Sequence, residues 1–205
     1  MLHGGAEVGG LEVRAARDGS RRISGRFPYA KLAVLSDGGK NGRPQKEQFA
    51  PKAFAYRVDD PKADIHILLG HDYDRPLASR GAGTLELQDT EAGLTFEATI
   101  LPEMAATSWA LDFFRSFAAG LIGGISPGFR IPPAATVPNA ETVTEEDPRL
   151  GRALIRTISA ALLYELSMVT VPAYKSTDLS VRDWTPDAGD ASASGLHRTL
   201  NRWRA

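Results

Sequence analysis

The sequence predicts a single strand-rich α+β domain, and three observations support this fold class. Several short segments alternate apolar and polar side chains with the period of two that is typical of strands. Glycine, proline, asparagine and aspartate separate these segments at short intervals. One longer segment instead repeats its apolar residues every three or four positions, as a helix does. With 42% apolar and 24% charged residues, the 205-residue chain has a globular composition.

The first predicted elements are strands at residues 11–16 and 22–26, joined by an Asp-Gly turn. A third strand is expected over residues 30–35, followed by a loop with the sequence SDGGKNGRPQ. The glycine-rich residues 1–10 that precede these strands are expected to be loose.

The middle of the chain alternates between strand and turn signals. Pro51 favours the start of a short helical turn. The apolar run at 65–69 predicts a strand that ends at Gly70. The sequence GTLELQDTEAGLTFEATI then predicts a hairpin, with strands at 84–88 and 94–100.

A helix is predicted next, because Leu111, Phe114, Phe117 and Leu121 follow one another at helical spacing. These four side chains are expected to form its apolar face. Gly120 is a suitable residue to end this helix.

The last third of the sequence suggests the domain boundaries. Residues 132–150 are rich in proline and acidic side chains and are expected to form a mobile insertion. The β-branched sequence ALIRTISAALLYELSMVTVPA that follows favours strands. We therefore predict a domain over residues 11–182 and a flexible tail over 183–205.

Composition excludes several classes of function. The net charge of −1 does not favour nucleic acid or an anionic membrane as a partner, and no apolar run is long enough to span a bilayer. We expect no signal peptide, because no basic segment precedes an apolar core at the N-terminus. Without cysteine, disulfides, thiolate metal sites and a cysteine nucleophile are excluded. We expect no cofactor.

The sequence GHDYDRP gathers His71, Asp72, Asp74 and Arg75 at the end of the predicted strand 65–69. Such a cluster is typical of a polar corner between a strand and a loop. A metal-dependent hydrolase with His66, His71 and Asp74 as ligands is an alternative, although the spacing lacks the usual helical pair of histidines.

Ser126 is the candidate nucleophile. It lies in the sequence LIGGISPGF, whose glycines and proline predict a sharp bend. The hydroxyl is either a structural turn group or a nucleophile, and a nucleophile requires a neighbouring base. The sequence matches the G-x-S-x-G pattern of hydrolases, but a helical pattern rather than a strand precedes it. Pro127 also lacks the amide that such enzymes direct at the oxyanion.

Four segments in a fixed order resemble the prohead (capsid maturation) proteases of tailed bacteriophages. They are LLGHDYDRPLAS, the hairpin GTLELQDTEAGLTFEATI, AAGLIGGISPGFR and LYELSMVTVPAY. ISGRFPYAKLAV and EQFAPKAFAYRV are similar to the opening segments of the family, although Lys52 replaces a common glycine. The resemblance covers residues 11–175. That family is similar in fold to the herpesvirus assemblins, which implies a closed or nearly closed antiparallel β-barrel of about six or seven strands with surrounding helices.

The resemblance also implies a catalytic set. His71 matches the catalytic histidine of the family and Ser126 its nucleophilic serine. Glu165 matches an acidic position on a late strand and is the expected third member. Assemblins use a second histidine there, but this chain has none between His71 and the predicted tail. Asp72 and Asp74 are alternative third members.

The implied function is cleavage of the scaffold, of the major capsid protein precursor and of the protease itself. It takes place in the host bacterial cytoplasm, inside the assembling prohead, with a homo-oligomer as the expected state. An inactive structural or scaffolding protein of the same fold is the other alternative. Within the tail, the linker between Asp187 and Leu196 is a candidate site of self-processing, and the segment LHRTLNRWRA a candidate address for a partner.

Overall fold

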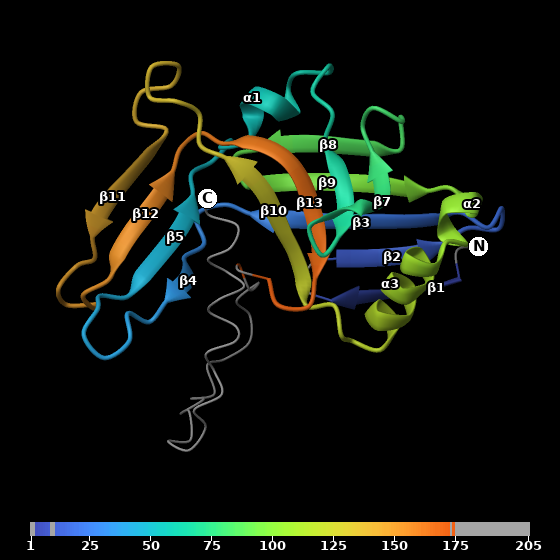
Figure 1. The fold of residues 1–205 in the computed structure, drawn as a ribbon, viewed down its shortest axis with the longest axis horizontal. Helices are drawn as coiled ribbons and strands as arrows, with labels where there is room; N and C mark the ends of the chain where they lie inside the picture. The colour runs from blue at the N-terminus through green and yellow to red at the C-terminus, as the bar shows by residue number, and fades with distance from the viewer. Residues whose placement is uncertain (1–2, 9–10, 173, 175–205) are drawn as a thin grey trace.

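The protein consists of three β-sheets with short helices beside them (Figure 1). The computed structural model describes residues 3–8, 11–172 and 174 of the chain. The predicted tail at 183–205, with its candidate cleavage and docking segments, therefore lies outside the described residues.

The largest sheet has five strands and is antiparallel throughout. In spatial order its strands are β1 (His3–Val8), β2 (Leu11–Ala15), β3 (Arg21–Pro28), β9 (Gly93–Ile100) and β8 (Leu85–Thr90). The strand β1 lies within the first ten residues, which the glycine content predicts to be loose. The hairpin of β8 and β9 is confirmed, and alternation along β9 buries Leu94, Phe96, Ala98 and Ile100 on one face.

The second sheet carries the predicted site residues. Its strands, in spatial order, are β10 (Gly124–Arg130), β13 (Leu162–Val169), β6 (His66–Leu69) and β7 (Asp72–Ser79). The strands β13 and β6 are parallel, and the other two pairs are antiparallel. One face of this sheet packs into the core through Ile67, Ile125, Leu166 and Met168.

The third sheet lies at one end of the molecule. Its strands are β11 (Glu141–Glu145), β12 (Leu154–Ile158), β5 (Gln45–Phe49) and β4 (Ala33–Ser36), of which β12 and β5 are parallel. The strand β11 belongs to the acidic insertion that composition predicts to be mobile. Ion pairs of Glu145 with Arg43 and of Glu141 with Arg156 connect it to neighbouring segments.

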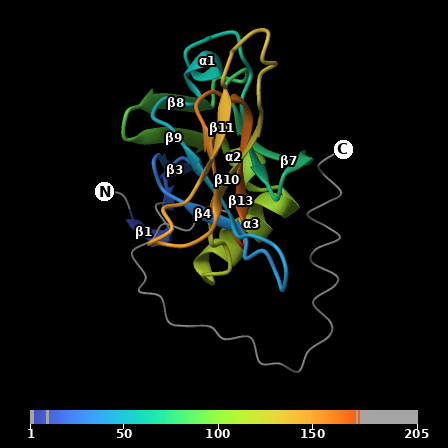
Figure 2. The same cartoon turned by 90° about the vertical axis from the view of Figure 1, so that its left-hand side faces the viewer.

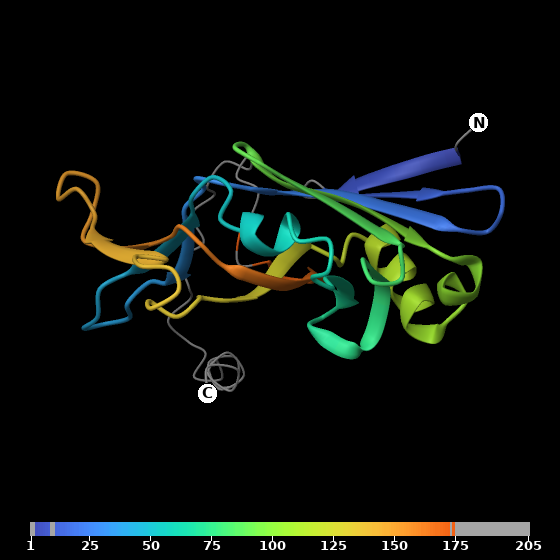
Figure 3. The same cartoon turned by 90° about the horizontal axis from the view of Figure 1, so that it is seen from above.

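The core lies between the first two sheets. Seen from above in Figure 3, β3 and β9 lie on one side of the molecule, and β10 and β13 on the other. The end-on view in Figure 2 separates the same two layers. Aromatic side chains fill the end near the third sheet, where Phe49 contacts Phe27, Phe54, Phe129 and Tyr174 with ring centroids 4.8–5.5 Å apart.

Three helices lie beside the sheets: α1 (Ala55–Val58), α2 (Pro102–Ala105) and α3 (Ser108–Ala118). None of these helices in the described part of the chain has the length and apolar content of a membrane span. The end of α3 at Gly120, which has φ = 71°, is confirmed. There the amides of Gly120 and Leu121 donate to the carbonyls of Phe117 and Ser116, which is the hydrogen-bond pattern of the Schellman motif.

The predicted apolar face of α3 is only partly correct. The helix buries Ala110, Phe113 and Phe117, whereas Leu111 is 38% exposed and Leu121 is 60% exposed. Two stripes of apolar side chains along α3 both include Phe117. The stripe that contains Ala110 has a small side chain there, which allows the helix to approach the core closely. Packing against the sheets therefore selects a stripe that apolar spacing alone does not single out.

The strand-rich α+β class is confirmed, but no sheet in the described residues closes into a barrel. Each sheet keeps two edge strands, and two of the pairings are parallel rather than antiparallel. The chain passes from the third sheet to the second at residues 159–161, between β12 and β13. Pairings such as β5 with β12 join segments more than 100 residues apart, so local alternation cannot reveal them.

Candidate active site

His71 lies at the tip of the tight turn between β6 and β7. Leu69 pairs with Asp72, so that only Gly70 and His71 form the loop. Both have positive φ, at 66° and 62°, as the central residues of a type I′ turn require. This conformation is unfavourable for a histidine, and it is stabilised by a hydrogen bond of 2.9 Å from the His71 amide to Ser167 Oγ.

Glu165 orients the imidazole of His71. Its side chain is 5% exposed, and Oε1 lies 2.7 Å from His71 Nδ1. The other oxygen, Oε2, accepts a hydrogen bond of 2.6 Å from the Ser167 hydroxyl. Because a carboxylate only accepts, Nδ1 carries the proton of the neutral ring, and Nε2 keeps its lone pair.

The same contact makes the imidazole more basic. The hydrogen bond that His71 donates to Glu165 raises the pKa of His71 above 6.5; burial of the ring lowers it and the charge of Glu165 raises it further. The His71 side chain is 44% exposed, so it can still exchange protons with a substrate or with water. An imidazole whose Nδ1 is hydrogen-bonded to a carboxylate and whose Nε2 is free to accept a proton can act as a general base.

Ser126 lies in the middle of the strand β10 and not on the predicted bend. It pairs with Ser167 across β13, and Gly128 pairs with Glu165. Paired residues in a sheet point to the same face, as do residues two apart along a strand. Ser126, Ser167 and Glu165 therefore share the face opposite to the core. Among the described residues, Ser126 and His71 form no direct hydrogen bond; in serine proteases this bond often tightens only when substrate binds.

Glycine and proline in β10 serve the strand rather than a turn. A Cβ atom at Gly128 would lie 1.8 Å from Glu165 Oε1, so only glycine leaves room for this carboxylate. Pro127 is tolerated because β10 is an edge strand, where one side of the backbone needs no partner. The bend was predicted because both residue types usually signal turns.

The two rival carboxylates do not contact His71 in the structure. Asp72 Oδ1 accepts the Asp74 amide at 2.9 Å, and Asp72 Oδ2 lies 3.2 Å from Arg75 Nε. Asp72 therefore forms the local turn contact that the polar-corner interpretation predicts. Among the predicted third members, Glu165 is the one that reaches the ring.

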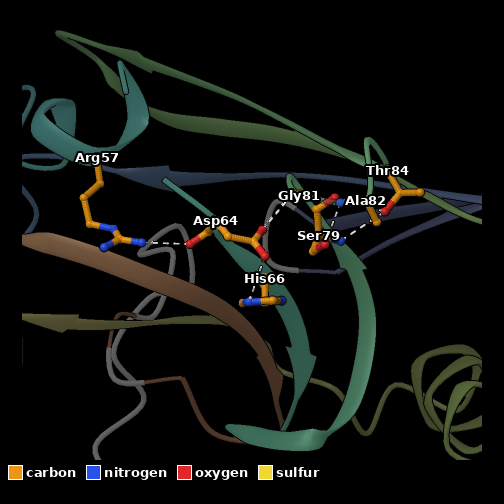
Figure 4. A network of polar contacts seen from close by, with 7 residues as sticks. All are labelled: Arg57, Asp64, His66, Ser79, Gly81, Ala82 and Thr84. Carbon is orange, nitrogen blue, oxygen red and sulfur yellow. Dashed lines mark hydrogen bonds and ion pairs between the residues drawn. The ribbon is translucent and has the colours of Figure 1, made fainter. Parts of the chain in front are cut away.

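His66 belongs to a different polar network, shown in Figure 4. Its Nε2 lies 3.5 Å from Asp64 Oδ2, and Asp64 Oδ1 accepts the Gly81 amide at 2.7 Å. The described part of the chain contains no group of three or more histidine or acidic side chains with the geometry of a metal site. The arrangement of His66, His71 and Asp74 thus gives no support to the metal-hydrolase alternative.

Ser167 is the site residue that the sequence analysis did not predict. It is fully buried, donates to Glu165 and accepts from the His71 backbone. One signal was available, because Ser167 follows Glu165 by two positions on a predicted strand and so shares its face. With both hydrogen-bonding roles occupied, its hydroxyl positions the other two residues.

A comparison with protein-family models matches residues 32–189 to the family described as Caudovirus prohead serine protease. The match covers well over half of the chain. The chain belongs to this family. Searches against curated proteins and solved structures return no match.

Membership of the prohead serine protease family confirms the resemblance drawn from the sequence. The matched segment contains the turn with His71, the strand with Ser126 and the strand with Glu165. A prohead serine protease cleaves capsid and scaffold precursors during prohead maturation. The chain is therefore assigned to the serine proteases.

Proposed function

We propose that Ser126, His71 and Glu165 are the catalytic triad of this prohead protease. The observation that carries the proposal is the contact of 2.7 Å between His71 Nδ1 and Glu165 on the sheet face that also holds Ser126. Nucleophile, base and orienting acid are the three roles that acyl transfer by a serine requires. They come from three neighbouring segments of one sheet.

The reaction follows from these roles. Ser126 Oγ attacks the carbonyl carbon of the scissile peptide while His71 Nε2 takes the hydroxyl proton. Glu165 stabilises the imidazolium, which then gives its proton to the departing amine as the C–N bond breaks. A water molecule, deprotonated by His71, releases the acyl group. Backbone amides stabilise the oxyanion. Pro127 cannot contribute, because proline has no backbone N–H.

The proposed substrates are the major capsid protein precursor, the scaffold and the protease itself. We place the reaction inside the assembling prohead in the host, where several copies of the chain act together. The enzyme needs no cofactor in this mechanism, because all proton transfers involve side chains of the chain itself.

Labelling with a fluorophosphonate probe tests the nucleophile, since only an activated serine reacts. The wild-type protein and a Ser159→Ala control, which changes an exposed serine, should be labelled. Ser126→Ala should lose the label and reduce cleavage of a co-expressed capsid precursor by about 10³-fold or more. If the wild type is not labelled, or if Ser126→Ala still cleaves, the triad is wrong.

A further inference from the structure

Two arginines close to the proposed triad have no acidic partner among the residues that the structure describes. Arg57 lies on α1 and Arg130 at the end of β10. Neither takes part in any of the ion pairs formed among the residues that the structure describes. Arg57 Nη2 donates to the backbone carbonyl of Asp64 at 2.8 Å (Figure 4), but its buried Nε has no partner.

An aromatic ring holds both guanidinium groups instead. The Arg57 Cζ atom lies 4.4 Å from the centroid of the Tyr164 ring, and the Arg130 Cζ atom lies 5.7 Å from it. Arginine stacks on aromatic faces in this way and keeps its N–H groups free at the edge. The two cations are therefore held near each other by a neutral group.

A bulge in β13 accounts for the position of Tyr164. The register passes from Gly128 opposite Glu165 to Phe129 opposite Leu163, so Tyr164 is the extra residue. Leu163 remains fully buried, whereas Tyr164 is partly exposed beside Glu165. The bulge thus turns the ring away from the core, toward the face with the proposed triad.

The arginines lie within reach of a bound substrate. Ser126 and Arg130 are four residues apart on β10 and share a face, which corresponds to about 13 Å along the strand. An extended substrate peptide has the same rise per residue as a strand, so it would span this distance in about four residues. Burial raises the pKa of Tyr73 on β7, Glu165 raises it further, and the charges of Arg57 and Arg130 lower it. These groups therefore surround one region of the surface.

Among the described residues, the carboxylate of the proposed triad forms no ion pair with these two cations. Both carboxylate oxygens of Glu165 already bind His71 and Ser167. The guanidinium groups are thus available to an external carboxylate, which they match in charge and in planar geometry.

We propose that Arg57 and Arg130, held over Tyr164, form a specificity subsite for an acidic side chain of the substrate. This side chain lies about three to five residues from the scissile bond. The proposal rests on the proposed roles of Ser126, His71 and Glu165. It identifies the substrate class as peptides with a glutamate or aspartate at a fixed distance from the cleaved bond.

The test begins with the bond that the protein cleaves in the capsid precursor, located by mass spectrometry. Fluorogenic peptides spanning this bond are then made in sets, with glutamate, glutamine or lysine at each of the five positions on either side. At one position, glutamate should raise kcat/KM about tenfold over glutamine. Arg130→Gln should bring this ratio close to one, and Arg130→Glu should favour lysine at the same position.

Matched controls separate the subsite from the chemistry. Arg22→Gln, which changes an exposed arginine on β3, should keep the wild-type ratio. The fluorophosphonate label on Ser126 should be unchanged in Arg130→Gln, because Arg130 is exposed and touches no member of the triad. Arg57→Gln should lower the ratio as well; if it fails to fold, Arg130→Gln alone decides.

A ratio of one at every position in the wild type would overturn the subsite, as would an unchanged ratio in Arg130→Gln. If either result is obtained while the wild-type protein is still labelled at Ser126, the proposed subsite is wrong but the proposed triad is not contradicted. Loss of labelling in the wild type contradicts the triad itself.

Discussion

Glu165 combines burial with full hydrogen bonding. A buried carboxylate is costly unless partners satisfy it, and here His71 and Ser167 occupy its two oxygens. Ser167 in turn binds the backbone of His71. Each of these three residues therefore fixes the position of the other two, and substituting Glu165 or Ser167 should change the position of the His71 ring.

Replacing Glu165 with glutamine should alter the pH dependence of cleavage. In the proposed mechanism, cleavage requires neutral His71, so kcat/KM should rise as pH increases through the pKa of this residue, which the hydrogen bond to Glu165 raises above 6.5. In Glu165→Gln the pKa should fall, and the acidic limb should move to lower pH. The plateau should also fall, by up to about 10⁴-fold.

A pH profile of kcat/KM for the free enzyme measures both effects. Glu86→Gln is the control, because Glu86 is an exposed carboxylate on β8 of the large sheet. Its acidic limb should match that of the wild type. An acidic limb that stays in place in Glu165→Gln would mean that another group orients His71.

Gly128→Ala should impair catalysis without removing a catalytic group. The new Cβ would lie 1.8 Å from Glu165 Oε1, so the carboxylate must move away from His71. We expect kcat to fall and KM to change little, because the displaced group acts on the base rather than on the substrate. Gly151→Ala is a matched control, since its Cβ would meet Glu146 at 2.3 Å, on the acidic segment beside the third sheet. Equal kcat for Gly128→Ala and wild type would contradict this account.

At the level of elements, the hairpin of β6 and β7 holds His71, the proposed base, in a strained conformation. Non-glycine residues with positive φ cost of order 1–3 kcal/mol, and His71 has φ = 62°. Such strain persists where the side chain at that position is needed.

Two substitutions measure this strain directly. His71→Gly and His71→Ala both remove the imidazole and its bond to Glu165, but only glycine accepts positive φ without penalty. We expect His71→Gly to be more stable than His71→Ala by about 1 kcal/mol in urea unfolding. Equal stabilities would show that the turn relaxes to another conformation when the side chain is lost.

The sequence predicts elements well where their signals are local. The hairpin of β8 and β9 has alternating strands beside a turn, and the structure confirms it. In contrast, β10 is predicted as a bend. Gly128 is needed there because Glu165 approaches it from a strand 37 positions later in the sequence, and no local signal reveals this contact. The motif around Ser126 makes it a candidate, but the roles of Ser126, His71 and Glu165 together follow from a family resemblance, since alternation and spacing cannot show that distant segments meet. Ser167 carries no motif and was missed.

At the scale of the whole molecule, Tyr174 connects the layers near the third sheet. Its ring packs on Phe27 of the large sheet and on Phe49 of the third sheet, with centroids 5.0 and 5.5 Å away. Its hydroxyl donates to the buried Glu47, whose other oxygen binds Arg156 Nη1 at 2.7 Å. The end of the described chain thus binds the third sheet through a polar contact, inside an aromatic cluster that also includes Phe27 of the large sheet.

Tyr174→Phe should therefore destabilise the whole domain. The variant keeps the ring but leaves Glu47 without one of its donors, at a cost of about 1–3 kcal/mol. Urea unfolding should show a lower midpoint with an unchanged slope, while Tyr56→Phe, at an exposed residue, should unfold like the wild type. A midpoint unchanged in Tyr174→Phe would mean that water replaces the hydroxyl.

The parallel pairing of β6 with β13 has a consequence for when the enzyme becomes active. His71 and Glu165 are 94 residues apart, and ribosomes add about 5–20 residues per second. The histidine is therefore made roughly 5–20 s before the carboxylate that orients it. With the proposed roles, a nascent chain that has not yet reached β13 carries Ser126 and His71 without the carboxylate that orients the histidine, so neighbouring polypeptides are safe from cleavage until that strand is made.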